Sequence, residues 1–269
     1  MTLTQPLKWH GGKFYLAKKI LNLFPPHTHY VEPYFGGGSV LLQKPSWMIE
    51  GYSEVVNDLN GELTNFWQVL RDAAFFREFI RRVEATPFSE HEWENPSEPA
   101  TEVERAANFF VRYRQSRQGL GSDFATLSRN RTRRGMNEQV SSWLSAIEGL
   151  PEIHARLQRV VILNRDALSV ITSQDGPNTF FYLDPPYLHE TRVSTDAYEC
   201  EMTEDQHRQL LIALAKIEGK FLLSGYHSRL YDKTAKYYNW HLAEIEIDNK
   251  ASSKKIKDTK TECLWRNYK

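Results

Sequence analysis

An apolar run, Phe180–Leu183, leads directly into Asp184, Pro185, Pro186 and Tyr187. Two successive prolines fix φ and have no backbone N–H, so this turn offers carbonyl and carboxylate acceptors and few donors. Such a corner suits an exocyclic amino group on a planar base. The carboxylate and a proline carbonyl would accept its two hydrogens while the tyrosine ring stacks on the base. A purely structural turn is the alternative.

A second candidate segment joins an apolar run to a glycine loop. Its sequence is YVEPYFGGGSV from Tyr30 to Val40. Gly36, Gly37 and Gly38 let the backbone approach a ligand closely, as in the nucleotide sites of doubly wound sheets. The order of the glycines is not G-x-G-x-x-G, which favours a small nucleoside cofactor over a nicotinamide dinucleotide. A tight turn between strand and helix is the alternative.

Asp58 is a candidate partner for a ribose. It ends another apolar run, twenty-six residues after Glu32. An acid at the end of the second strand accepts hydrogen bonds from ribose hydroxyls, and its usual distance along the chain is about twenty residues. Asp58 could instead cap a helix that begins near Asn60, and the two roles are compatible.

The elements that must position these residues alternate between short apolar runs and helical patterns. We expect strands at residues 29–32, 54–57, 159–163, 179–183, 220–224, 241–247 and 261–266. Helices are expected at residues 14–24, 60–70 and 203–217, the last opened by a capping box of Thr203 and Gln206. This alternation predicts a layered α/β fold, in which ligands bind beyond the carboxyl ends of the strands.

The pattern changes between residues 71 and 156, where opposite charges form separate blocks. Residues 84–104 hold seven glutamates and neither Lys nor Arg, and three prolines interrupt them, which predicts an exposed, irregular stretch. Residues 105–134 hold eight arginines and one acid. We interpret residues 71–156 as an inserted, mostly helical subdomain of a domain formed by residues 1–70 and 157–269.

The arginine block is a candidate nucleic-acid surface. Arginine forks suit guanine edges and phosphates, and Gln and Asn suit adenine. The candidates are Arg112, Arg114, Arg117, Gln118, Arg129, Asn130, Arg131, Arg133 and Arg134. A solvated basic face paired with the acidic block is the alternative. A second basic run, residues 250–260, is expected to be a surface loop that touches phosphates at most.

Composition limits the class of protein. The 269 residues carry 34 Lys and Arg against 34 Asp and Glu, so a surface for a polyanion must be local. Cys200 and Cys263 and the nine histidines have no metal-ligand spacing, so we expect neither a metal site nor a disulfide, and a reducing compartment. We also expect a cytoplasmic protein, because the first residues lack the apolar core of a signal peptide and no run reaches a membrane span.

Four segments together resemble a known family. Lys8–Lys13 (KWHGGK), Glu32–Gly38, Asn57-Asp58 and Asp184–Tyr187 resemble, in content and order, the Dam-like adenine-N6 DNA methyltransferases of the D12 class. The resemblance covers nearly the whole chain and is weakest in residues 71–156. His10 departs from the small residue that is more common in the family. The resemblance implies a Rossmann-like S-adenosylmethionine-dependent methyltransferase sheet with an inserted target-recognition subdomain, of bacterial or phage origin.

The same resemblance implies the ligands and the site residues. The cofactor would be S-adenosylmethionine, with S-adenosylhomocysteine as product and no metal, and the substrate double-stranded DNA with a flipped-out adenine. A cognate restriction endonuclease is a candidate partner. The implied catalytic residues are Asp184, Pro185, Pro186 and Tyr187. The implied cofactor-binding residues are Trp9, Lys13, Glu32, Pro33, Phe35, Gly36, Gly37, Gly38, Asp58, Asp166 and Asp184.

Two other functions stay open. A cytosine-N4 methyltransferase modifies an exocyclic amine through a similar turn, and the leading aspartate favours adenine by resemblance only. A DNA-binding protein that has kept the fold and lost turnover is the other alternative. The presence of Asp184, Tyr187, Lys13 and Asp58 disfavours that second interpretation.

Overall fold

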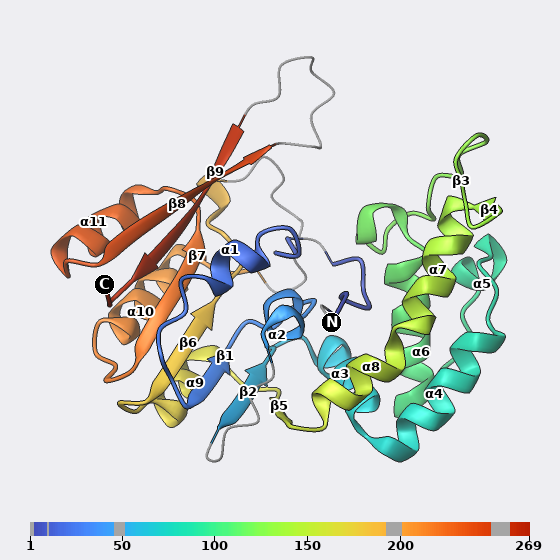
Figure 1. The fold of residues 1–269 in the computed structure, drawn as a ribbon, viewed down its shortest axis with the longest axis horizontal. Coiled ribbons are helices and arrows are strands. Elements are labelled where there is room, and N and C mark those ends of the chain that lie inside the picture. The colour runs from blue at the N-terminus through green and yellow to red at the C-terminus, as the bar shows by residue number, and fades with distance from the viewer. Residues whose placement is uncertain (1–2, 10, 46–51, 192–200, 249–258) are drawn as a thin grey trace. The chain divides into compact units, whose positions relative to one another are not determined.

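The computed structural model describes residues 3–9, 11–45, 52–191, 201–248 and 259–269, and Figure 1 shows its ribbon. The chain forms two compact units. The helical unit comprises Met1–Leu23, Gly36–Glu50 and Asn60–Asn164, and the sheet unit comprises Phe24–Phe35, Gly51–Leu59 and Arg165–Lys269. His10, Cys200 and the side chains of the basic run at 250–260 lie outside the described residues.

The units do not divide at the predicted boundaries, residues 71 and 156. Three earlier segments, residues 1–23, 36–50 and 60–70, cluster with the helical region. The reason is packing: α3 (Gly61–Arg71) contacts α4 (Ala73–Ala85) and α6 (Glu102–Arg114), so its apolar face contributes to the helical core. The functional assignment of residues 71–156 stays a prediction.

The sheet unit is built on six strands in the order β2-β1-β6-β7-β9-β8. β1 is parallel to β2 and β6, β6 is parallel to β7, and β9 is antiparallel to both β7 and β8. Their bounds are β1 His29–Glu32, β2 Ser53–Asn57, β6 Thr179–Leu183, β7 Lys220–Gly225, β8 His241–Asp248 and β9 Thr259–Arg266. All five residues of β6 are buried, as its unbroken apolar sequence requires of a central parallel strand. The predicted α/β fold with a mostly parallel sheet is confirmed.

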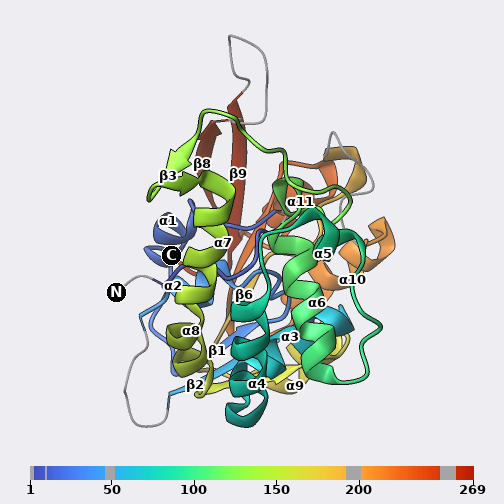
Figure 2. The same cartoon turned by 90° about the vertical axis from the view of Figure 1, so that its right-hand side faces the viewer.

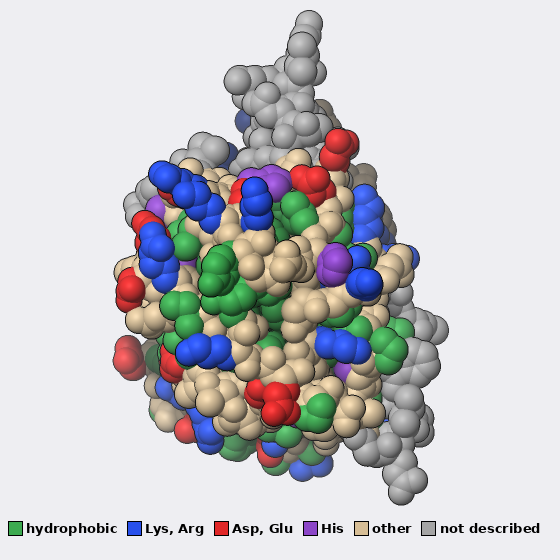
Figure 3. Space-filling model, turned by 90° about the vertical axis from the view of Figure 1, so that its left-hand side faces the viewer, with side chains coloured by type: hydrophobic (Ala, Val, Ile, Leu, Met, Phe, Trp, Pro, Cys, Tyr) green, Lys and Arg blue, Asp and Glu red, His purple; other side chains and the backbone are tan. Residues whose placement is uncertain are grey.

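Among the described residues of the sheet unit, three α-helices accompany these strands, namely α9 (Ala167–Gln174), α10 (Glu204–Leu214) and α11 (Arg229–Tyr237), together with the 3-10 turn His189–Thr191. The predicted capping box of α10 is present, because Thr203 accepts from the backbone of Gln206 and Gln206 accepts from the backbone of Thr203. Figure 3 shows the face of this unit with α10 and α11, where hydrophobic side chains lie among charged ones. In the sheet unit, Ile212 of α10 and Tyr237 of α11 are among the exposed large hydrophobic residues.

The helical unit packs its helices around an aromatic core. Phe66 on α3 stacks on Phe110 of α6 with ring centroids 5.9 Å apart, and Phe79 of α4 meets Phe110 edge-on at 5.8 Å. Figure 2 shows α4 and α6 side by side. The remaining elements are α1 Ala17–Leu21, α2 Ser39–Gln43, α5 Glu90–Glu94, the 3-10 turn Arg117–Gly119, α7 Glu138–Glu148, α8 Leu150–Leu157, β5 Val160–Leu163 and the hairpin of β3 (Thr132–Arg133) with β4 (Met136–Asn137).

Two sequence predictions need correction. The helix expected at residues 14–24 forms only as α1, whose N-cap Leu16 offers no capping side chain. The acidic stretch is not wholly irregular, since α5 lies within it and α6 begins in it at Glu102. Ser89 and Thr101 cap these helices, and glutamates in a first turn interact favourably with the helix dipole.

Each predicted strand agrees with an observed strand to within two residues at either end. Among the described residues, none of the helices is long and apolar enough to cross a bilayer.

Candidate functional site

The glycine loop of the helical unit is shaped by Trp9. Gly36 and Gly38 have φ of +51° and +69°, a region that other residues enter only with strain. Gly37 is required for space, because a Cβ there would lie 2.7 Å from the Cβ of Trp9. The indole N–H of Trp67 donates to the Gly36 carbonyl at 3.0 Å. The loop is therefore fixed from two sides by tryptophans.

The N-terminal motif folds against this loop. The Trp9 ring lies 5.0 Å from Tyr113 and 6.2 Å from Phe109, both on α6. Lys13 is buried, and its Nζ donates to the Gly11 carbonyl at 3.0 Å. The helical unit thus brings together Trp9, Lys13 and the three glycines, five of the predicted cofactor residues.

In the sheet unit, Asn57 connects two loops at the carboxyl ends of the strands. Its Nδ2 donates to the carbonyls of Pro33 and Arg165, both at 3.0 Å, and its Oδ1 accepts from Arg165 N–H at 2.9 Å. The Asn57 carbonyl also accepts from Phe35 N–H at 2.9 Å. Asn57 therefore fixes the chain on which Pro33, Asp58 and Asp166 stand. The sequence prediction used Asn57 only as the neighbour of Asp58.

The predicted acids of the sheet unit have different surroundings. Asp166 caps α9 by accepting from Ser169 N–H at 2.9 Å. Asp58 is half-buried, and the cap of α3 is Asn60, which accepts from Leu63 N–H at 2.9 Å. The capping alternative therefore belongs to Asn60, and the ribose role of Asp58 stays a prediction. Glu32 is buried and accepts from the Tyr30 hydroxyl at 2.9 Å.

The turn after β6 is anchored through Tyr187. The residue is only 7% exposed, its hydroxyl donates to the Glu262 carboxylate, and Ser224 Oγ lies 3.2 Å from that hydroxyl. Ser224 also donates to Glu262. Burial, followed by the charges of Asp184 and Glu262, raises the pKa of Tyr187 well above its ordinary value. The hydroxyl therefore stays protonated and able to donate.

Sequence reasoning missed Glu262 and Ser224. Glu262 stands on β9 and is 1% exposed, although a carboxylate is rarely buried without partners. The sequence signal was an acid in the otherwise apolar run that ends at Trp265. Ser224 on β7 gave no sequence signal, because serine occurs in strands in many structural roles.

Negative charge gathers around Tyr182 on β6. Burial first, and then the carboxylates of Asp184, Glu262 and Glu32, raises the pKa of the Tyr182 hydroxyl well above its ordinary value. Three acids of the sheet unit therefore act on the Tyr182 hydroxyl, which stays protonated.

The candidate DNA-binding residues fall into two groups. Arg112 stacks on Trp93 at 4.1 Å, half-buried Arg114 donates to the Ser142 carbonyl at 2.9 Å, and Arg134 pairs with Glu148 at 2.8 Å. Burial lowers the pKa of Arg114 to about 10. The second group is exposed, as Arg112 and Arg134 also are, and its Arg131 lies 3.8 Å from Glu138. It comprises Arg117, Gln118, Arg129, Asn130, Arg131 and Arg133.

The exposed segment near Gln118 is held close to the N-terminal motif of the same unit. Gly119 has φ of +73°, and a Cβ there would collide with the carbonyl oxygen of Lys8. Lys8 in turn donates to Gln139 at 3.1 Å. Arg131 and Arg134 form their ion pairs with Glu138 and Glu148. These two glutamates lie outside the acidic block of residues 84–104.

Comparisons with known proteins agree on one family. A family model described as D12 class N6 adenine-specific DNA methyltransferase matches residues 9–248. A DNA N-6-adenine-methyltransferase of Escherichia phage P1 is 37% identical over 68 residues, which are 25% of this chain and 8% of that protein. DNA adenine methylases of two Vibrio cholerae strains are 38% identical over 65 residues, 24% of this chain and 22% of theirs.

These matched segments span well under two thirds of the length of the relatives. A solved structure from Pyrococcus horikoshii, described as a candidate RNA methyltransferase, covers 71% of this chain and 96% of its own. Its sequence identity is 11% and its TM-score 0.26, which is too low to support a conclusion about fold or function.

Proposed function

Because this chain belongs to the D12 class of N6 adenine-specific DNA methyltransferases, we propose that it methylates N6 of a flipped-out adenine in double-stranded DNA, with S-adenosylmethionine as donor. The observation that carries the proposal is the turn Asp184–Tyr187, which directly follows β6 and is anchored by a buried carboxylate. Adenine N6 cannot be reached inside a duplex, so the base must leave the stack at a cost of a few kcal/mol.

The residues present fit the proposed cofactor. A sulfonium is positively charged, and Asp184, Glu262 and Glu32 supply negative charge in the sheet unit. We assign Asp58 to the ribose and Asp166 to the adenine of the cofactor. Trp9 and Lys13 line its methionine end, and the loop of residues 35–38 cradles it. Glu32 and Pro33 complete this set. When bound, the cofactor supplies an electrophilic methyl group.

Asp184 and Pro185 act on the target amine. Its lone pair is delocalised into the purine ring, which makes it a weak nucleophile. Hydrogen bonds from the amine to the Asp184 carboxylate and the Pro185 carbonyl favour a tetrahedral nitrogen, whose lone pair would then be free to attack the methyl group that the bound cofactor would supply. Acceptors placed in advance stabilise the positive charge that develops on N6. The amine proton is lost after transfer, so Asp184 need not remove it beforehand.

Tyr187 holds the base, and Glu262 with Ser224 holds Tyr187. Stacking of a base on an aromatic ring is worth about 1 to 3 kcal/mol, which offsets part of the cost of flipping. The ring serves only in the right orientation, and its hydroxyl is bonded to Glu262 and lies beside Ser224. Pro186 keeps the turn rigid because its φ is fixed.

The exposed arginines of residues 117–133 are the proposed grip on DNA. Their guanidinium groups are available to phosphates and to guanine edges. Arg112 and Arg114 already serve packing within the protein, and Arg134 forms a surface ion pair with Glu148. We assign the activity to the cytoplasm of a bacterium or of a phage-infected cell, where a cognate restriction endonuclease would be its partner.

Methylation of a plasmid with labelled cofactor tests the proposal. Digestion to nucleosides is expected to give N6-methyladenine, and mapping the modified bases gives the recognition sequence. N4-methylcytosine would instead establish the cytosine alternative. Binding to DNA without methyl transfer would establish the inactive DNA-binding protein. Asp184→Ala is the control, which should abolish transfer.

A further inference from the structure

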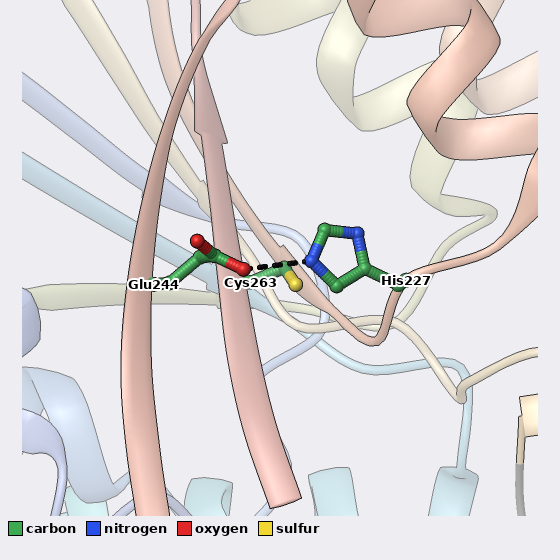
Figure 4. A group of neighbouring side chains, drawn as sticks. All are labelled: His227, Glu244 and Cys263. Carbon is green, nitrogen blue, oxygen red and sulfur yellow. Dashed lines mark hydrogen bonds and ion pairs between the residues drawn. The ribbon is translucent and has the colours of Figure 1, made fainter.

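Three side chains with metal-binding atoms meet at one side of the sheet unit. His227 follows β7, Glu244 stands on β8 and Cys263 on β9 (Figure 4). Their ligand atoms all lie within 4.8 Å of one another, and His227 Nε2 is 2.8 Å from Glu244 Oε1. The three residues lie outside the predicted methyl-transfer residues, and their separations along the chain match no familiar ligand spacing.

The strand register places these residues together. Cys263 on β9 pairs with Gly225 of β7 on one side and with Glu244 of β8 on the other. His227 comes two residues after Gly225, in the loop that leads to α11. The cluster is therefore a consequence of backbone pairing across three adjacent strands. It does not depend on long side chains reaching across the surface.

Asp232 on α11 orients the imidazole. Its two carboxylate oxygens lie 3.0 and 3.1 Å from His227 Nδ1, while Nε2 faces Glu244. A carboxylate on the second nitrogen of a ligand histidine is the common arrangement in metal sites, because it fixes the tautomer and increases the basicity of the ligand nitrogen. Asp232 thus leaves Nε2 as the nitrogen directed at the cluster.

We infer that His227, Glu244 and Cys263 form a binding site for Zn²⁺ or a divalent ion of similar softness. One nitrogen, one sulfur and one oxygen suit Zn²⁺ and Co²⁺, whereas Mg²⁺ and Ca²⁺ take oxygen ligands. Tetrahedral bonds of about 2.0 to 2.3 Å put ligand atoms roughly 3.5 Å apart, which small rotamer shifts of these side chains achieve. The ion replaces the proton shared by His227 and Glu244 and the thiol proton of Cys263.

Exposure allows the ion to enter. The side chains of His227 and Glu244 are 45% and 54% exposed, so solvent reaches two of the ligands and supplies the fourth. Cys263 is buried and offers its sulfur from the sheet. The ion would join the β7–α11 loop to β8 and β9. Tyr226 in that loop lies 4.7 Å from the Tyr187 ring, so the loop adjoins the predicted base-binding turn.

Metal binding to the full-length protein tests this inference. Titration calorimetry with Zn²⁺ on chelator-treated protein should give one site, and Zn²⁺ should raise Tm. Co²⁺ should give a thiolate-to-cobalt charge-transfer band. His227→Gln and Glu244→Gln should weaken binding by more than tenfold, and Cys263→Ser should abolish the band. Asp232→Asn should weaken binding by about tenfold, as expected of an orienting carboxylate.

Three substitutions serve as controls. Glu246→Gln and His241→Gln change neighbouring exposed residues of β8 that have the same chemistry. Cys200→Ser removes the other cysteine. All three should bind like the unaltered protein and keep the cobalt band. The inference is overturned if no stoichiometric site is found, or if His227→Gln and Glu244→Gln bind Zn²⁺ as tightly as Glu246→Gln does.

Discussion

The hydroxyl and the ring of Tyr187 have separate roles. Its hydroxyl is bonded inside the protein to Glu262, while its ring belongs to the predicted base-binding corner. A strand-to-turn motif therefore depends on an acid seventy-five positions later in the chain. Substitutions that remove the hydroxyl alone, or the ring as well, distinguish the two roles.

Removal of the ring should affect catalysis more than cofactor binding. Tyr187→Ala loses about 1 to 3 kcal/mol of stacking, which corresponds to a roughly 5- to 150-fold lower kcat/KM for DNA. Cofactor affinity, measured by calorimetry, should change only a few-fold. Tyr187→Phe keeps the ring but loses the hydroxyl that orients it, so its turnover should fall less than that of Tyr187→Ala. Near-normal turnover in Tyr187→Ala would exclude the stacking role.

Removal of the hydroxyl should instead affect stability. Tyr187→Phe leaves the buried Glu262 with one donor fewer, and an unmet buried partner costs about 1 to 3 kcal/mol, more when it is charged. Urea denaturation should show this loss. In the double variant Tyr187→Phe, Glu262→Gln, the loss should be smaller than the sum of the two single losses. Additive losses would mean that the two side chains are not coupled.

Substitution of Asn57 should destabilise the protein more than substitution of its neighbour Asp58. Asn57 is 1% exposed and joins the loops of Pro33 and Arg165 through both atoms of its amide. Asn57→Ala leaves several backbone groups without partners, and each costs about 1 to 3 kcal/mol. Asp58→Ala, measured by the same urea denaturation, should cost far less while weakening cofactor binding. Equal stability of the two variants would contradict the role assigned to Asn57.

The contact with Trp9 restricts which residues the glycine loop between β1 and α2 can hold. Gly37→Ala places a Cβ 2.7 Å from the Cβ of Trp9, closer than carbon atoms approach, so either the loop or the tryptophan must move. We expect a lower Tm and at least tenfold weaker cofactor binding.

Gly61→Ala is the matched control for that substitution. Gly61 opens α3 and has no atom within 4 Å of an added Cβ, so alanine there should stabilise the protein by about 0.5 to 1 kcal/mol. Equal effects of the two substitutions would contradict the proposed contact.

The Glu104 carboxyl at the start of α6 should make the stability of the protein depend on pH. Glu104 accepts from Ala100 N–H at 2.7 Å and pairs with Arg82 at 2.8 Å, and these contacts, in that order, lower the pKa of its carboxyl. A group with a lowered pKa stabilises the fold above its ordinary pKa, and the contribution is lost as pH falls through the lowered value.

Glu104→Gln should therefore lower Tm at pH 7, and the difference from the unaltered protein should shrink towards pH 3. Circular dichroism at both pH values measures this. Glu98→Gln, in the exposed loop before α6, is the control and should leave Tm unchanged. A Tm difference that is the same at both pH values would exclude the ionised carboxyl as its cause.

The elements show how far sequence reasoning extends. Buried parallel strands such as β6 were predicted because an unbroken apolar run is a local signal. The helix α5 was missed because the prolines on either side of it, Pro87 and Pro96, and its glutamates outweighed the cap at Ser89. The roles of Glu262 and Asn57 depend on partners far away in the sequence, and one chain without related sequences gives no record of such pairs. Trp9 was predicted as a cofactor residue, but its packing on Gly37 was not.

At the scale of the whole molecule, zero net charge makes the exposed arginines decisive for DNA binding. Replacing Arg117, Arg129 and Arg133 by glutamine should reduce the slope of log affinity against log salt by about 0.9 for each phosphate that these side chains neutralise. Arg208→Gln is the control, because Arg208 lies on α10 and pairs with Glu204. Fluorescence anisotropy over a salt series measures the slopes. An unchanged slope in the triple variant would remove these arginines from the interface.

The last strand in the order of the sheet unit, β8, has a further consequence for association. An outer strand has unpaired backbone groups that a foreign strand can complete, which is a common route to aggregation. Glu244 and Glu246 stand exposed on β8, so a second copy laid against it would meet like charges. Glu244, the proposed ligand of an ion, thus also helps to keep neighbouring molecules apart in a crowded solution, as does Glu246.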